Sequence, residues 1–257
     1  MFTVTPIPAF QDNYIWMLKK PNSTEVFVVD PGDAAAVIAT LQQQRLSLAG
    51  ILITHHHADH TGGALQLSEA FQAPIYGPAN SPFKGISRPL NDGDSCLVLG
   101  ETLQVKRVPG HTLDHISYFL PGEVPQLFCG DTLFLAGCGR LFEGTPSQLL
   151  TAMRYFSRLP DVTEVYCTHE YSMANLAFAA AVEPQNIDIQ QSIRQCQLKR
   201  DADQPTVPSN IAKERLINPF MRTATDSVRT AASQQQGAEV GDEEAVMSVI
   251  REWKNNF

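Results

Sequence analysis

THHHADH, residues 54–60, contains four of the seven histidines of the chain and directly follows the apolar run GILI. Such a run predicts a short buried strand, so the histidines lie where the strand ends and the chain turns toward a helix. On an extended chain, residues two apart face the same way, which aims His55 and His57 at one point. Asp59 and His60 follow on the turn and can face a second point nearby. Imidazole and carboxylate suit zinc, iron and manganese, so the block predicts two adjacent metal sites.

Three further ligand candidates share one context, an apolar run that ends in a single His or Asp. His111 lies in PGHT, Asp131 in FCGDTLF and His169 in VYCTHE. A carboxylate can bridge two cations, and Asp131 is the natural bridge between the two predicted sites. A lone histidine at a strand end is more often a core or capping residue, but four within residues 55–60 argue against that interpretation. For His56 and His115, packing or support of a ligand is favoured.

The order of patterns predicts an α/β domain followed by a mostly helical one, with the boundary near residue 170. Before it, apolar runs alternate with helical spacing, and after His169 the patterns are helical. Asp30, in VVDPG, is either a turn residue before proline or a carboxylate that orients a ligand imidazole. Expected strands cover 25–30, 50–54, 74–76 and 164–167; expected helices cover 34–46, 64–71, 146–159, 171–182, 186–200 and 242–255; a polar stretch covers 233–241.

Composition narrows the class of protein. The chain has 257 residues, 43% hydrophobic and 18% charged, which is ordinary for a globular protein and excludes a disordered chain or a miniprotein. A net charge of −8 argues against broad binding to nucleic acid, which needs clustered Lys and Arg. No apolar run is long enough for a membrane span, and we identify no signal peptide. Five cysteines without a CxxC pair predict free thiols in the cytoplasm.

The histidine block resembles the HxHxDH signature of the metallo-β-lactamase superfamily, and GHT, GDTLF and CTHE follow it in the expected order. That resemblance implies an αββα sandwich with metals at one edge between two sheets. Further blocks resemble the glyoxalase II family, the hydroxyacylglutathione hydrolases, which add a smaller all-α C-terminal domain. The implied domains are a catalytic domain over 1–170 and a helical substrate-binding domain over 171–257. These blocks are QDNY (11–14), VVDPG (28–32), GCGRLFEGT (137–145), THEY (168–171), PTVPS (205–209) and NPFMR (218–222).

The glyoxalase II resemblance also implies the role of each ligand. Two divalent metals per chain are expected, zinc foremost, with iron or manganese as alternatives. The implied catalytic group is a metal-bound hydroxide held by the dinuclear site, with no protein nucleophile. One metal would be held by His55, His57 and His111, the other by Asp59, His60 and His169, and Asp131 would bridge them.

The implied substrate is S-D-lactoylglutathione, hydrolysed to glutathione and D-lactate in methylglyoxal detoxification. The positions that match the family's glutathione contacts are Arg140, Phe142, Tyr171, Arg251 and Lys254. The last two rest on the short match REWKNNF, and a pair of solvated surface charges is nearly as good an interpretation. We expect a cytoplasmic monomer whose partner is the glutathione thioester, with no nucleic acid and no membrane.

Two kinds of alternative remain open. One is another hydrolase of the same fold, such as a lactonase, a β-lactamase, a phosphodiesterase or a nuclease, or a persulfide dioxygenase with a single iron; the blocks GCGRLFEGT and NPFMR argue against these. The other is a metal-free scaffold that keeps the fold, and seven intact ligand-type residues argue against it.

Overall fold

The computed structural model describes all 257 residues, and the chain divides into two compact units. The first unit comprises residues 1–107 and 114–130, and the second comprises 108–113 and 131–257. This division is a different one from the predicted domain boundary at residue 170, which stays a prediction. No helix in the structure is long and apolar enough to cross a membrane.

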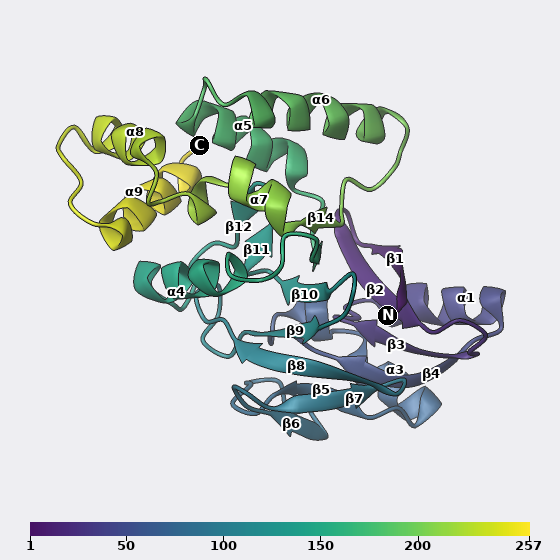
Figure 1. Cartoon of the computed structure of the whole chain (residues 1–257). Coiled ribbons are helices and arrows are strands. Elements are labelled where there is room, and N and C mark those ends of the chain that lie inside the picture. The colour runs from purple at the N-terminus through teal and green to yellow at the C-terminus, as the bar shows by residue number, and fades with distance from the viewer. The chain divides into compact units, whose positions relative to one another are not determined.

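A mixed six-stranded sheet forms the first half of the first unit, with strand order β1-β2-β3-β4-β5-β6. Strands β1, β2 and β3 pair antiparallel, and β3 also starts a parallel series that continues through β4, β5 and β6. Helices α1 (Ala34–Gln44) and α3 (Ala64–Phe71) pack against it and share one buried apolar cluster with its strands (Figure 1). The strands are β1 (Thr3–Ala9), β2 (Asn13–Lys19), β3 (Glu25–Val29), β4 (Ser47–Leu52), β5 (Ile75–Pro78) and β6 (Arg88–Leu90).

Within the first unit the second sheet has the order β10-β9-β8-β7, and within the second unit β13 pairs with β14. Strands β9 and β10 are buried along their whole length, as expected for strands covered on both faces. Tyr118 of β9 donates a hydrogen bond to the carbonyl of Ile53, next to β4, so the sheets meet inside the first unit. The predicted α/β sandwich is therefore confirmed. The strands are β7 (Ser95–Val98), β8 (Glu101–Arg107), β9 (Ile116–Leu120), β10 (Gln126–Gly130), β13 (Glu164–Cys167) and β14 (Ser209–Asn210).

The second unit is mostly helical, and the C-terminal region beyond residue 170 is helical as predicted. A capping box between Thr145 and Gln148 starts α4 (Pro146–Phe156), with proline in its first turn. A two-stranded hairpin, β11 (Leu133–Phe134) and β12 (Gly137–Cys138), precedes it. The other helices are α5 (Ser172–Val182), α6 (Ile187–Asp201), α7 (Ile211–Ile217), the 3-10 helix η1 (Pro219–Met221), α8 (Asp226–Gln236) and α9 (Glu243–Asn255), while α2 (Ala58–Thr61) lies in the first unit.

Two parts of the sequence-based expectation differ from the structure. The N-terminal strands β1 and β2 were not predicted, because Pro6 and Pro8 break the usual strand pattern. Both prolines lie on β1, which is an edge strand and needs no donor on its outer side. The helix α8 was not predicted either, and its last residues lie in the polar stretch 233–241; it buries only Val228 and Ala232 and so shows little apolar periodicity.

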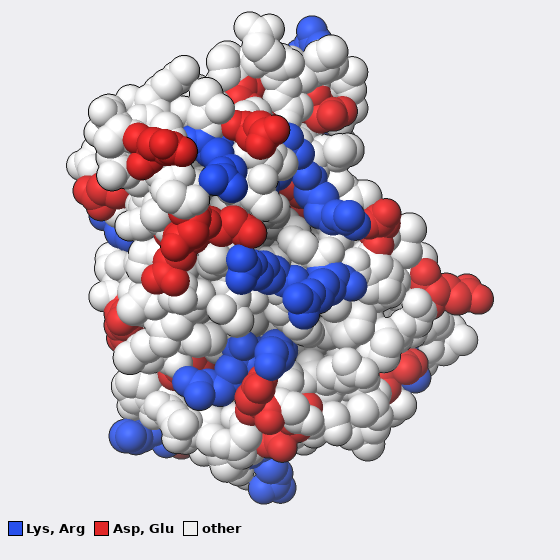
Figure 2. Space-filling model, turned by 60° about the vertical axis from the view of Figure 1, so that its left-hand side comes forward, with Lys and Arg blue, Asp and Glu red and all other residues white.

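Charged side chains are interleaved on the face drawn in Figure 2. Groups of Lys and Arg lie there between groups of Asp and Glu. This face therefore lacks the uninterrupted basic surface that binding to nucleic acid phosphates requires.

Candidate metal centre

The first unit presents the histidine block directly after β4. His57 is the residue before α2, so the chain leaves the strand and enters a helical turn within the block. His55 and His60 are fully buried, His57 is half-buried, and the Asp59 side chain is 40% exposed. The predicted position of the block, at the end of a strand and the start of a helix, is therefore confirmed.

Asp30 orients the His55 imidazole through Thr54, as one of its two interpretations predicted. Its Oδ1 accepts a hydrogen bond of 2.7 Å from the Thr54 amide, and its Oδ2 accepts one of 2.7 Å from the Thr54 hydroxyl. Because that hydroxyl hydrogen is committed, Oγ1 of Thr54 acts as acceptor for His55 Nδ1 at 3.1 Å. Nδ1 of His60 lies 3.0 Å from Asp30 Oδ2. The His55 imidazole therefore carries its proton on Nδ1 and leaves its Nε2 lone pair for a metal, whereas His60 Nδ1 lies close to Asp30 without a hydrogen bond.

Asp59 is held in place by two residues, Asn13 and Gly32, for which the sequence predicted no individual role. Asn13 donates a hydrogen bond of 3.0 Å to Asp59 Oδ2, and Nε2 of His60 lies 3.5 Å from the same oxygen. A Cβ on Gly32 would lie 1.9 Å from the Asp59 carbonyl oxygen, so only glycine allows this close approach. Both residues lie in blocks that carry the family resemblance, Asn13 in QDNY and Gly32 in VVDPG, so the sequence marked the segments but not the residues.

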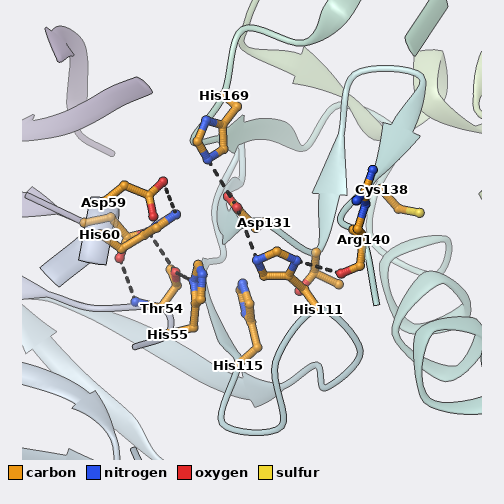
Figure 3. A network of polar contacts seen from close by, with 12 residues as sticks. Thr54, His55, Asp59, His60, His111, His115, Asp131, Cys138, Arg140 and His169 are labelled. Carbon is orange, nitrogen blue, oxygen red and sulfur yellow. Dashed lines mark hydrogen bonds and ion pairs between the residues drawn. The ribbon is translucent and has the colours of Figure 1, made fainter. Parts of the chain in front are cut away.

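The second unit contributes His111, Asp131 and His169, all of them buried. Nε2 of His169 lies 3.2 Å from Asp131 Oδ2, and Nε2 of His111 lies 3.5 Å from the same oxygen. Figure 3 shows the two imidazoles pointing toward this carboxylate. Nδ1 of His111 donates a hydrogen bond of 2.8 Å to the carbonyl of Arg140, which leaves its Nε2 lone pair facing Asp131.

The donor set fits a borderline or hard divalent metal. Neutral imidazole Nε2 atoms and carboxylate oxygens are ligands that zinc, iron and manganese accept. A carboxylate oxygen that faces two such nitrogens suits a bridge, the role predicted for Asp131. The chain thus contains a His and Asp cluster able to bind metal.

The remaining two histidines support the block, as predicted. His56 Nδ1 lies 2.9 Å from Asp114 Oδ1, and Ser81 donates a hydrogen bond of 2.8 Å to the other oxygen of Asp114. His115 is fully buried and stacks on His55, with ring centroids 4.6 Å apart. Neither Asp114 nor Ser81 was singled out in the sequence, because an isolated acid or hydroxyl has no motif around it.

Two exposed aromatic side chains flank the imidazoles of the second unit. Phe142, 62% exposed, lies 5.3 Å from the His111 ring, and Tyr171, 38% exposed, stacks on His169 at 4.7 Å. Arg140 is also exposed. Within the second unit, these three predicted substrate residues therefore lie beside His111 or His169.

The two C-terminal candidates have a different environment. Arg251 is only 5% exposed, and its Nη1 donates a hydrogen bond of 2.9 Å to the Cys138 carbonyl. Lys254 donates one of 3.1 Å to the Ala174 carbonyl, and burial lowers the pKa of its ammonium, with the Arg251 charge acting in the same direction. Their contact with substrate stays a prediction.

Comparison with known proteins covers the whole chain. The metallo-β-lactamase superfamily model matches residues 10–169, and the model described as the hydroxyacylglutathione hydrolase C-terminus matches residues 170–257. The hydroxyacylglutathione hydrolase of Chromohalobacter salexigens is 48% identical over 257 residues, and that of Pseudomonas fluorescens is 47% identical over 258, each alignment covering all of both chains. The crystal structure of ETHE1 from Myxococcus xanthus is similar in fold, with a TM-score of 0.67 and 25% identity over 98% of this chain and 91% of that one.

Proposed function

The chain belongs to the hydroxyacylglutathione hydrolase family of the metallo-β-lactamase superfamily, and we propose that it hydrolyses S-D-lactoylglutathione to glutathione and D-lactate. One observation carries this proposal: full-length relatives of that name are 45–48% identical to the chain across both of the regions that the family models match. The fold alone would leave a lactonase or a phosphodiesterase open, because one fold serves many activities. The match over 170–257 is what favours a glutathione thioester.

We assign the two metals to the ligand sets that the sequence predicted. Contacts within each unit support the assignment: in the first unit Nε2 of His60 lies 3.5 Å from Asp59 Oδ2, and in the second unit Nε2 of His111 and of His169 face Asp131 Oδ2. Asp131 would then bridge the two metals. Zinc is the proposed metal, with iron or manganese as alternatives that the same donors accept.

The chain's own residues prepare this site. Two divalent ions bound here would lower the pKa of a water molecule and stabilise negative charge on the thioester carbonyl oxygen. The Thr54 hydroxyl, itself bound to Asp30, and the Arg140 carbonyl hold the protons of His55 and His111 on Nδ1, so that each Nε2 would be free to bind a metal. The leaving group is a thiolate, so no strong general acid is needed.

Substrate recognition is assigned to exposed residues beside the second unit's ligands. Phe142 and Tyr171 supply apolar walls next to His111 and His169. Arg140 supplies a positive charge for a carboxylate of glutathione, against the net charge of −8 of the whole chain.

Arg140→Ala should raise KM for the glutathione thioester about two- to fivefold and leave kcat unchanged. An exposed ion pair is worth little, and a contact made equally in ground and transition states acts on binding alone. Steady-state kinetics at low and high salt measure the effect, which should shrink in high salt. Arg158→Ala, another exposed arginine of the same unit, is the control. A fall in kcat with unchanged KM would contradict the binding role.

His57→Ala should lower kcat/KM by about a hundredfold or more, whereas His56→Ala should lower it by less than about tenfold. His57 is an assigned ligand, while the Nδ1 of His56 faces Asp114 instead. Metal content and kinetics of the two variants give the comparison. Equal metal loss in both would show that His56 also binds metal.

The compartment and the oligomeric state are part of the proposal. All five cysteines are buried free thiols, and burial raises the pKa of Cys96 to about 12, which makes it unreactive. Such thiols suit a reducing compartment, for which we propose the cytoplasm. Size-exclusion chromatography tests the expected monomer.

The experiment for the proposed function compares three substrates on the metal-loaded protein. We expect glutathione release from S-D-lactoylglutathione, with little hydrolysis of a β-lactam or a phosphodiester, and two metals per chain. Faster turnover of either competitor would replace the proposed substrate. A single iron per chain with oxygen-dependent turnover would indicate a dioxygenase, and absence of metal and turnover would indicate a scaffold.

A further inference from the structure

Arg251 brings a positive charge into the interior of the second unit. It lies on α9, is 5% exposed, and its guanidinium carbon lies 5.1 Å above the Phe220 ring. Its Nη1 donates a hydrogen bond of 2.9 Å to the Cys138 carbonyl and lies 3.3 Å from the Cys138 sulfur. Burying a guanidinium is costly unless it is hydrogen-bonded, so this bond ties the helix to the end of β12.

The residues that follow Cys138 wrap around His111. Gly139 packs so closely that a Cβ there would lie 2.9 Å from His111 Nδ1. The Arg140 carbonyl accepts the hydrogen bond from that Nδ1, and the Phe142 amide donates one of 3.2 Å to the His111 carbonyl. The orientation of the His111 ring therefore depends on where this segment begins, which is the peptide that Arg251 holds.

We propose that Arg251 is a positioning residue, which fixes the His111 imidazole through the Cys138 carbonyl and the Gly139–Arg140 segment. This inference rests on the proposed function in one respect, that His111 binds a metal. It assigns the buried arginine to the metal site, in addition to any contact that it makes with substrate. A ligand whose ring is held by a fixed acceptor binds metal more tightly, and loss of such an acceptor costs 10- to 100-fold in affinity.

Lys254 provides a matched comparison on the same helix. It lies one turn from Arg251, yet it donates to the Ala174 carbonyl on α5 and its Nζ lies 5.2 Å from the Phe178 ring. Its hydrogen bond and its ring contacts are therefore made to α5 and to Phe257 rather than to the segment around His111. If both residues only bind a substrate carboxylate, their loss should have the same consequence.

The test compares Arg251→Met with Lys254→Met in the zinc-loaded full-length protein. Competition with a chromophoric chelator measures zinc retention, and thermal unfolding checks the fold. We expect retention of the more weakly held zinc to fall about tenfold in Arg251→Met and to stay unchanged in Lys254→Met. In Arg251→Met, kcat should fall for the glutathione thioester and for a small thioester without glutathione alike.

Further variants separate the contribution of the Cys138 sulfur from that of its carbonyl, and a partial loss of donors at position 251 from a complete one. Cys138→Ala removes the sulfur but not the carbonyl, so its zinc retention should stay at the wild-type value. Arg251→Lys keeps one donor and should retain zinc better than Arg251→Met but less well than wild type. Unchanged zinc retention in Arg251→Met, or in Arg251→Lys if the methionine variant does not fold, would overturn the positioning role. His111→Ala is the separate check: two tightly held metals in that variant would refute the proposed ligand set itself.

Discussion

Asp131→Asn should abolish the dinuclear site and lower kcat/KM by more than about a hundredfold, beyond what the loss of a ligand's supporting partner costs. Oδ2 of Asp131 faces Nε2 of both His111 and His169, at 3.5 and 3.2 Å. Asparagine has no charge, so an amide oxygen in the place of Oδ2 would bind two cations far more weakly than the carboxylate oxygen would. Elemental analysis of the purified variant and turnover of S-D-lactoylglutathione give the result.

Asp114→Asn is the matched control for that change. Asp114 is also a buried aspartate, but its oxygens contact His56 and Ser81 rather than two ligand imidazoles. We expect this variant to keep both metals. Two tightly bound metals and normal turnover in Asp131→Asn would show that the carboxylate does not bridge, and the ligand assignment would then have to be revised.

The sequence predicts the elements that carry the candidate ligands because each ligand directly follows a short apolar run. The predicted helix 64–71 and the predicted strand 164–167 agree with α3 and β13 at both ends. The predicted strand 50–54 likewise corresponds to β4 (Ser47–Leu52), although β4 ends two residues earlier, at Leu52. The apolar pattern is strong in these segments because each buries an apolar face, that of α3 and that of β4 in one shared cluster.

Contacts through the backbone could not be predicted, because they carry no side-chain signature. The acceptor for His111 is the carbonyl of Arg140, a residue whose side chain suggested only substrate binding. Likewise, Arg251 and Lys254 lie three apart on one predicted helix, which indicates a common face but not burial. Their different partners, Cys138 and Ala174, depend on how the helix packs.

The structural role of the block NPFMR could not be predicted from the sequence either. Asn218 at its start donates hydrogen bonds to the Phe134 and Gly137 carbonyls, at 3.1 and 2.9 Å, and so holds the hairpin β11–β12. Glu214, one turn earlier, is fully buried and accepts from the Ala136 amide at 2.8 Å. Burial raises the pKa of this carboxyl, although its hydrogen bonds act in the opposite direction. The resemblance marked the block, but only the structure shows that it supports the segment between Asp131 and Arg140.

Gly139→Ala should destabilise the protein and empty the metal site together. A Cβ at this position would lie 2.0 Å from the Asp131 carbonyl oxygen and 2.9 Å from His111 Nδ1. The first of these atoms belongs to the backbone, so it cannot move aside without displacing a ligand. We expect the free energy of unfolding to fall by about 3 kcal/mol, the upper end for overpacking, which corresponds to a Tm lower by about 6–12 °C.

Gly241→Ala separates this steric effect from the general effect of replacing glycine. A Cβ on Gly241 has no atom within 4 Å, and its backbone is outside the left-handed region. That variant should keep its metals and change in stability by less than about 1 kcal/mol, because it only reduces the freedom of the unfolded chain. Thermal unfolding and elemental analysis of both variants, each purified with metal present, give the comparison. If Gly139→Ala melted at the wild-type temperature with two metals bound, the segment around His111 could shift at no cost, and the close packing of Gly139 would not control the site.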